Sequence, residues 1–154
     1  MDSYITLAHR INHTRYNLSY PTLSRVTGMI RDGNMVLCDN QYGKYTLAQA
    51  IEHIRKQPEN EMQYWKARLL PAVAYNGIFS EIDSTHLISY SNVTAMDFDH
   101  IGTQDEMTGL RNWLIRTPCV LCVFVTPGGR GLKALILHDL SLIHISEPTR
   151  LRCI

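Results

Sequence analysis

The sequence predicts an α+β protein in which a mostly antiparallel sheet carries helices on one face and follows a helical N-terminal region. Two observations predict this class. Apolar residues recur at helical spacing in the first part of the chain, and residues 93–137 are patterned as a strand, a helix and two apolar strands joined by a glycine turn. We expect one domain over residues 1–139, with a mainly helical part, 1–69, and a sheet core, 70–139.

The composition is that of an ordinary soluble domain. The chain has 154 residues, of which 45% are hydrophobic and 19% charged, and its formal net charge is +1. This charge excludes a global basic field, so binding to nucleic acid must be local. No apolar run approaches the roughly 20 residues of a membrane span. The first residues also lack the pattern of a signal peptide, so we expect a cytoplasmic protein without a membrane partner.

Elements of the N-terminal part follow from periodicity and capping residues. Residues 4–11 are patterned as a short strand. Apolar residues in 22–31 share one helical face, and Asp32-Gly33 is a stop signal. Thr46 is a good N-cap for a helix over residues 47–56, and residues 59–69 form a further helix.

The second part alternates strands with one helix. We expect an extended segment over 70–75, a turn at Asn76-Gly77, and strands over 86–90, 93–98, 119–125 and 132–137. Residues 104–116 are predicted to form an amphipathic helix. Its inward residues are expected to be Met107, Leu110, Trp113 and Leu114.

Two acids at the end of an apolar strand are candidate metal ligands. Residues two apart on a strand point the same way, so Asp97 and Asp99 lie roughly 6.5 to 7 Å apart. Mg²⁺ or Mn²⁺ would relieve the repulsion between two ionised carboxylates, because these hard cations bind carboxylate oxygens. The alternative is a pair of solvated aspartates at a strand end. His100 is either a ligand or general base, or an exposed loop residue.

The turn Pro127–Gly131 is a candidate phosphate site. Gly128, Gly129 and Gly131 allow the backbone to approach a ligand, and amides exposed in such a turn form an anion nest. Arg130 or Lys133 would add positive charge. The spacing is not that of a P-loop, and the alternative is a plain glycine hairpin.

Neither the cysteines nor the last residues carry functional information. Cys119 and Cys122 have zinc-knuckle spacing, but residues three apart on a strand face opposite ways, so we expect a structural role. Leu140–Arg150 resembles the translation of a transposase adapter used in preparing DNA libraries. We therefore assign residues 140–154 to a non-native tail and expect the natural protein to continue beyond Asp139.

These motifs occur together in one known family. Leu70-Pro-Ala-Val73, Gly77-Ile-Phe79, Met96-Asp-Phe-Asp-His100 and Val123–Lys133 fall in an order that resembles the "VirE N-terminal-like" family of bacterial mobile elements. That family is similar to the catalytic core of archaeo-eukaryotic-type primases. The resemblance implies a primase-like, RRM-like core, in which Asp97 and Asp99 are both the metal-binding and the catalytic residues.

The resemblance also implies a nucleotide site and partners. The implied nucleotide- and phosphate-binding residues are Lys66, Thr126, Gly128, Gly129, Arg130, Gly131 and Lys133. Lys133 stands where primases tend to carry a histidine, and a third acid would lie beyond Asp139. The implied partners are nucleotides and nucleic acid, with DNA the expected class, and a helicase-type domain in the remainder of the protein.

Three functions remain open from the sequence. The first is metal-dependent nucleotidyl transfer by a primase-like domain of a replication protein. The second is a catalytically inactive module that binds nucleic acid or protein. The third is a metal-dependent phosphohydrolase that shares only the acidic strand.

Overall fold

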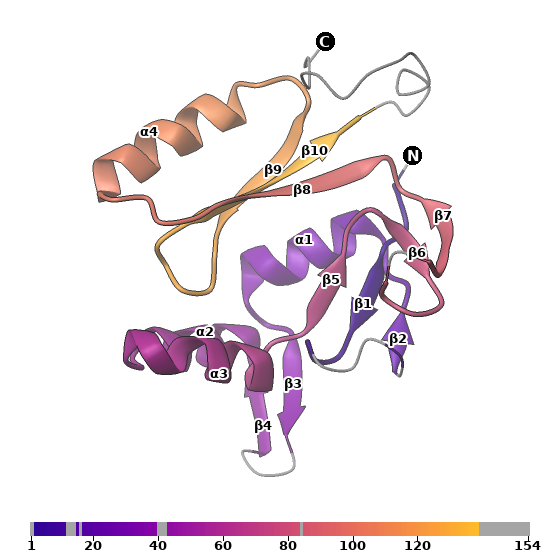
Figure 1. Ribbon diagram of the computed structural model, residues 1–154, viewed down its shortest axis with the longest axis horizontal. Coiled ribbons are helices and arrows are strands. Elements are labelled where there is room, and N and C mark those ends of the chain that lie inside the picture. Colours follow the sequence, from indigo (N-terminus) through magenta and orange to yellow (C-terminus); the bar gives the residue numbers. More distant parts are fainter. Residues whose placement is uncertain (1, 12–14, 16, 40–42, 84, 139–154) are drawn as a thin grey trace. The chain divides into compact units, whose positions relative to one another are not determined.

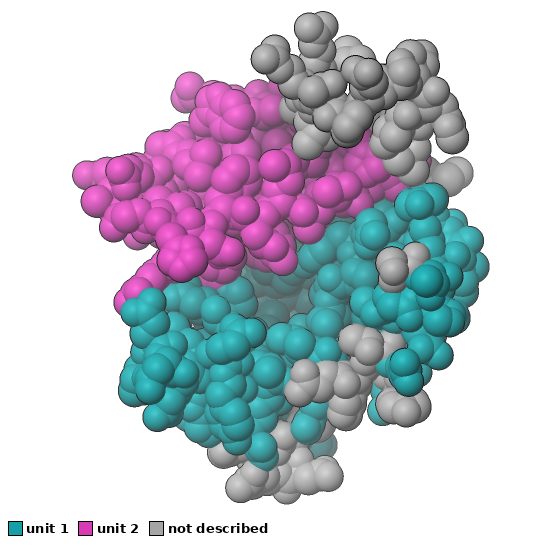
Figure 2. Space-filling model, in the orientation of Figure 1, with its two compact units in different colours: residues 1–91, 127–129 teal, residues 92–126, 130–154 magenta. Residues whose placement is uncertain are grey.

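The computed structural model describes residues 2–11, 15, 17–39, 43–83 and 85–138. The protein is an α+β chain of helices and small antiparallel sheets (Figure 1). It divides into two compact units (Figure 2): unit 1 comprises Met1–Ser91 and Pro127–Gly129, and unit 2 comprises Asn92–Thr126 and Arg130–Ile154. No helix among the described residues is long and apolar enough to cross a membrane.

Unit 2 contains an antiparallel three-stranded sheet with a helix on one face (Figure 1). Its strands are β8 (Val93–Phe98), β9 (Val120–Val125) and β10 (Leu132–Leu137), arranged in the order β8-β10-β9. The predicted hairpin of β9 and β10 is confirmed. The middle strand of the described sheet is β10, so the acidic strand β8 lies at an edge.

Helix α4 (Gln104–Ile115) covers this sheet and begins at a capping box. Thr103 accepts a hydrogen bond from the amide of Glu106, whose side chain accepts one from the amide of Thr103. Met107 and Leu114 of the helix pack with Leu132 and Ala134 of β10. These apolar contacts attach the helix to the sheet.

Trp113 differs from the prediction that it points inward. Its side chain is 62% exposed. Successive helical residues are turned by about 100°, so Trp113 lies beside the stripe defined by Met107, Leu110 and Leu114 rather than on it. Met107, Leu110 and Leu114 pack toward the sheet as predicted, whereas the buried side of the helix is too narrow to include Trp113.

Three helices of unit 1 match the predicted ranges. They are α1 (Leu23–Asp32), α2 (Leu47–Arg55) and α3 (Glu59–Leu69). Thr22 caps the start of α1 and Gly33 its end, and Thr46 forms a capping box with Gln49 at the start of α2. Local signals therefore determine these boundaries.

In the described part of the first 69 residues, four short strands accompany the three helices. These are β1 (Thr6–Ala8), β2 (Leu18–Ser19), β3 (Val36–Asp39) and β4 (Gly43–Thr46). Three further strands of unit 1 are β5 (Ala72–Ala74), β6 (Gly77–Phe79) and β7 (Leu87–Tyr90). They form the sheets β2-β1-β5, β3-β4 and β6-β7. Strands this short carry little periodicity, so sequence patterning missed several of them.

Two sets of contacts hold unit 1 together. Leu47, Ala50 and Ile54 of α2 pack with Leu69 at the end of α3 and Leu37 of β3. In the sheet region, the buried hydroxyl of Thr6 donates to the carbonyl of Gly77 (3.0 Å) and accepts from the amide of Phe79 (2.9 Å). These two hydrogen bonds link β1 to β6. Strand β6 in turn pairs with β7, and the 79–87 loop joins these two strands.

Candidate functional site

Asp97 faces Lys133 across two paired strands of unit 2. The two residues are register partners in β8 and β10. Lys133 Nζ lies 3.1 Å from Asp97 Oδ1, and the side chains are 28% and 49% exposed, respectively. The strand register therefore brings together one predicted acid and one predicted cation that lie far apart in sequence.

Both side chains lie on the sheet face opposite to α4. Leu132 and Ala134 of β10 pack against the helix. Side chains alternate between the two faces of a strand, so Lys133 between them points the other way, and its register partner Asp97 does the same. The apolar helix interface and the ionic pair thus use different faces of the same strands.

Asp99 lies beside Gly131, just after the end of β8. A methyl group placed on Gly131 would be 3.1 Å from Asp99 Oδ1 and only 2.5 Å from the carbonyl oxygen of Phe98. The absence of a side chain at Gly131 is what allows this close approach. The two acids therefore flank the segment Gly131–Lys133, and they lie at the end of an edge strand of the described sheet.

Thr126 and Gly131 close the loop between β9 and β10. The amide and the hydroxyl of Thr126 both donate to the carbonyl of Gly131, at 2.9 and 3.3 Å. The carbonyl of Arg130 accepts from the amide of Ile101 at 3.1 Å, which connects the loop to the segment after β8. Of the predicted phosphate-binding residues, Thr126 thus uses its hydroxyl within the loop, whereas the side chain of Arg130 is exposed.

Lys66, Gly128 and Gly129 belong to unit 1, whereas the acids and Lys133 belong to unit 2. A methyl group on Gly128 would lie 3.2 Å from Lys66 Nζ, which places the ammonium group of α3 against this turn. The structure therefore brings the predicted residues together as two groups, one in each unit.

The carboxylates of Asp97 and Asp99 have the chemistry that Mg²⁺ or Mn²⁺ requires. Such hard cations keep several waters and need only one or two carboxylates from the protein. The ammonium of Lys133 would compete with a cation for Asp97, because it already lies at ion-pair distance. His100 is exposed and has a left-handed φ of 58°, which places it in the turn after β8.

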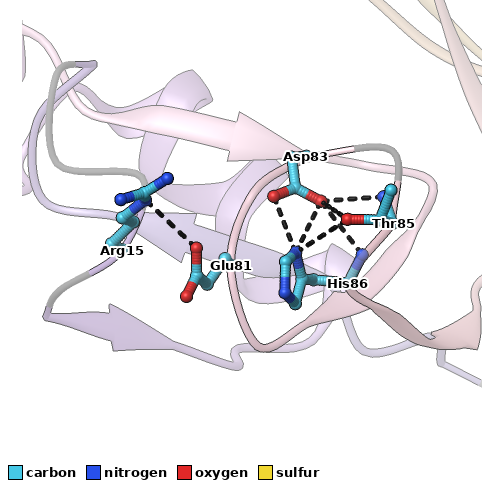
Figure 3. A network of polar contacts seen from close by, with 5 residues as sticks. All are labelled: Arg15, Glu81, Asp83, Thr85 and His86. Atoms are coloured by element: carbon cyan, nitrogen blue, oxygen red, sulfur yellow. Dashed lines mark hydrogen bonds and ion pairs between the residues drawn. The ribbon is translucent and has the colours of Figure 1, made fainter.

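A second group of ligand-type side chains was not predicted from the sequence. Ligand atoms of Glu81, Asp83 and His86 in unit 1 lie within 4.8 Å of one another, and this is the only such group of three among the described residues (Figure 3). Glu81 also forms an ion pair with Arg15 at 3.1 Å. The Glu-x-Asp-x-x-His spacing was the available sequence signal.

The carboxylate of Asp83 accepts hydrogen bonds from residues of its own turn (Figure 3). Asp83 accepts from His86 Nδ1 at 2.7 Å and from the amides of Thr85 and His86 at 2.8 and 3.0 Å. The His86 contact, followed by the Thr85 amide, lowers the pKa of Asp83 from 3.8 to about 2. A turn-stabilising role therefore explains this cluster without a ligand.

Neither Cys119 nor Cys122 forms a disulfide within the described residues. Burial raises the pKa of the Cys122 thiol. Within the described residues neither cysteine belongs to a group of three potential metal ligands. The structural role of the two cysteines stays a prediction.

Unit 1 also contains a small pocket of about 210 Å³ between β4, α2 and α3. Its walls include Tyr45, His53 and Trp65, and the last two rings meet edge to face with centroids 4.6 Å apart. None of the predicted site residues lines this pocket.

Comparison with known protein families identifies the family of this chain. Residues 65–145, more than half of it, match the family described as BT4734-like, N-terminal domain, and the chain belongs to this family. The matched range contains every predicted site residue and also residues 140–145, which the sequence analysis assigned to the tail. Among curated proteins and among solved structures, none matches the chain. The tail itself lies outside the described residues.

Proposed function

We propose that this member of the BT4734-like family is a primase-like module of a mobile-element replication protein that binds nucleotides with a divalent cation. The observation that carries the proposal is the position of Asp97 and Asp99 on either side of the Gly131–Lys133 segment. Two carboxylates beside a cation-bearing glycine loop suit a metal-bound phosphate. The proposed reaction is metal-dependent nucleotidyl transfer in the complete protein.

Each group has a proposed task. Asp97 and Asp99 hold Mg²⁺ or Mn²⁺, which supplies charge neutralisation and polarisation of phosphate oxygens when bound. Lys133 lies opposite Asp97 in the register and would bind a phosphate oxygen beside a cation held by the two acids. An ammonium group is a suitable phosphate ligand because it carries its charge at one flexible point.

The proposal extends to the surroundings of the module. The resemblance to primase-like proteins favours DNA as the nucleic acid and a helicase-type domain elsewhere in the protein. The matched family is described as an N-terminal domain, which is compatible with such a neighbour. On the sheet face opposite to α4, the side chains of Lys133 and Asp97 are 28% and 49% exposed, so their charged groups are accessible to a ligand.

Titration calorimetry with MnCl₂ and dATP tests this proposal on the whole chain. We expect dATP to bind more tightly with Mn²⁺ than without it, and Asp97→Asn with Asp99→Asn to abolish the difference. If the affinity for dATP depends neither on Mn²⁺ nor on the two acids, the proposal is contradicted and the inactive module is favoured. Mn²⁺-dependent release of phosphate from dATP without incorporation into a primer would favour the phosphohydrolase.

A further inference from the structure

We infer that Arg55, together with Lys66 and the amides of Gly128 and Gly129, forms a metal-independent phosphate site in unit 1. The starting observation is a contact across 72 residues of sequence: Arg55 Nε donates to the carbonyl of Pro127 at 3.2 Å. Arg55 is the last residue of α2 and Lys66 belongs to α3. Both helices therefore direct a cation to the same turn.

The two cations lie against neighbouring residues of that turn. A methyl group on Gly128 would lie 3.2 Å from Lys66 Nζ, and one on Gly129 would lie 3.4 Å from Arg55 Nε. Glycine at both positions leaves the backbone open where the cations approach. Gly129 also has a left-handed φ of 79°, a conformation in which successive amides can point to one side as an anion nest.

Several donors of this group have no partner within the described ranges. The Nη groups of Arg55 and the ammonium of Lys66 take part in no hydrogen bond or ion pair there. The amides of Gly128 and Gly129 likewise donate to no described residue. Two positive groups without a carboxylate repel one another, and a bound anion with several acceptor oxygens removes that repulsion while satisfying the donors.

A phosphate group fits this donor set best. The planar guanidinium offers paired donors to two phosphate oxygens, while Lys66 supplies a point charge. The inference rests on the proposed function for the source of the phosphate, which is either the triphosphate of a nucleotide or the backbone of a nucleic acid. It adds Arg55 to the predicted binding residues and makes phosphate binding independent of Asp97 and Asp99.

Calorimetry without divalent cations tests the inference on the whole chain, with inorganic tripolyphosphate in one arm and an oligo-dT strand in the other. We expect Arg55→Gln and Lys66→Gln each to weaken binding roughly tenfold or more, since a hydrogen bond to a charged group is lost. The matched control is Arg25→Gln, which removes an exposed arginine from α1 of the same unit. An effect in the first arm alone identifies a nucleotide triphosphate, and an effect with oligo-dT identifies the nucleic-acid backbone.

The inference is overturned if neither probe binds, or if Arg55→Gln and Lys66→Gln bind both probes as the wild type does. Thermal melts of each variant show whether it is folded, and the two substitutions on separate helices serve as independent checks. Failure here is distinguishable from failure of the proposed function. If the further inference fails, tripolyphosphate binding is unchanged in Arg55→Gln. If the proposed function fails, Mn²⁺-dependent dATP binding is unchanged in Asp97→Asn.

Discussion

Two acid–base pairs in this protein are built in different ways. Asp83 and His86 are three residues apart and meet at 2.7 Å within one turn, whereas Asp97 and Lys133 meet at 3.1 Å across two strands. The first carboxylate is satisfied by its own turn. Within the described residues the second carboxylate, that of Asp97, pairs with Lys133 alone, so it retains capacity for a ligand. A dense local cluster is therefore weaker evidence for a binding site than a sparse pair assembled by sheet register.

The largest expected effect is that of substituting Gly131, because the site of Asp97 and Lys133 depends on this residue and the turn of Asp83 and His86 does not. A methyl group there would lie 2.5 Å from a backbone oxygen of Phe98, so Gly131→Ala should lower the free energy of unfolding by about 1–3 kcal/mol. Urea unfolding followed by circular dichroism measures it. The matched control is Gly109→Ala in α4, where a methyl group meets nothing within 4 Å and should stabilise by up to about 1 kcal/mol. Equal effects of the two changes would disprove the close approach.

Substitution of single acids separates the two clusters by metal affinity. Asp97→Asn and Asp99→Asn should each weaken Mn²⁺ binding by at least about tenfold, because even the loss of an outer-shell partner costs that much at metal sites. Asp83→Asn should leave the affinity within about twofold if hydrogen bonds of the turn already occupy that carboxylate. Paramagnetic relaxation of water by bound Mn²⁺ reports the affinity. A loss of Mn²⁺ affinity in Asp83→Asn alone would show that the metal binds at the turn of Asp83 and not at Asp97 and Asp99.

Removal of Lys133 should raise metal affinity rather than lower it. Its ammonium lies 3.1 Å from Asp97 Oδ1, and a unit charge at about 4 Å contributes about 1 kcal/mol in bulk water. Lys133→Met should therefore bind Mn²⁺ about fivefold more tightly and change the free energy of unfolding by less than about 1 kcal/mol. Lys44→Met, on the exposed part of β4, is the control. Weaker Mn²⁺ binding by Lys133→Met would show that the two groups do not compete.

The smallest effect concerns the acid titration of the 81–86 turn. Hydrogen bonds from His86 and Thr85 lower the pKa of Asp83 from 3.8 to about 2. The ionised carboxylate therefore stabilises the turn fully above pH 3.8, and this contribution is lost as the pH falls through about 2. The amide resonances of Thr85 and His86 should shift with a midpoint near pH 2, and Asp83→Asn should abolish the shift. A midpoint at the ordinary value would refute the turn role.

Local patterns predicted the elements better than their grouping. The range of α3 and that of β10 agree with the prediction at both ends, since a helix of that length and an apolar strand after a glycine turn are strong local signals. The strand β8 was predicted, but its edge position was not, because the order β8-β10-β9 depends on pairing between distant residues. The short strands β2, β3 and β6 were missed for lack of periodicity.

The candidate site divides in the same manner. Strand spacing indicated that Asp97 and Asp99 act together, and the glycine turn indicated a place for Lys133. The pairing of Arg55 with Pro127 had no sequence signal, because nothing in a helix-ending arginine shows which distant turn it will meet. The Glu81–Asp83–His86 group did have a recognisable spacing, but it was not predicted from the sequence.

The sequence by itself determined the caps, the helix ranges, the hairpin of β9 and β10 and the identity of the chemical groups. These depend on hydrogen bonds and periodicities within a few residues. Only the tertiary structure decided that the chain forms two compact units, that β8 is an edge strand, and which cations face which turns. Such choices depend on contacts between segments far apart in the chain, where many pairings bury similar apolar area and packing selects among them.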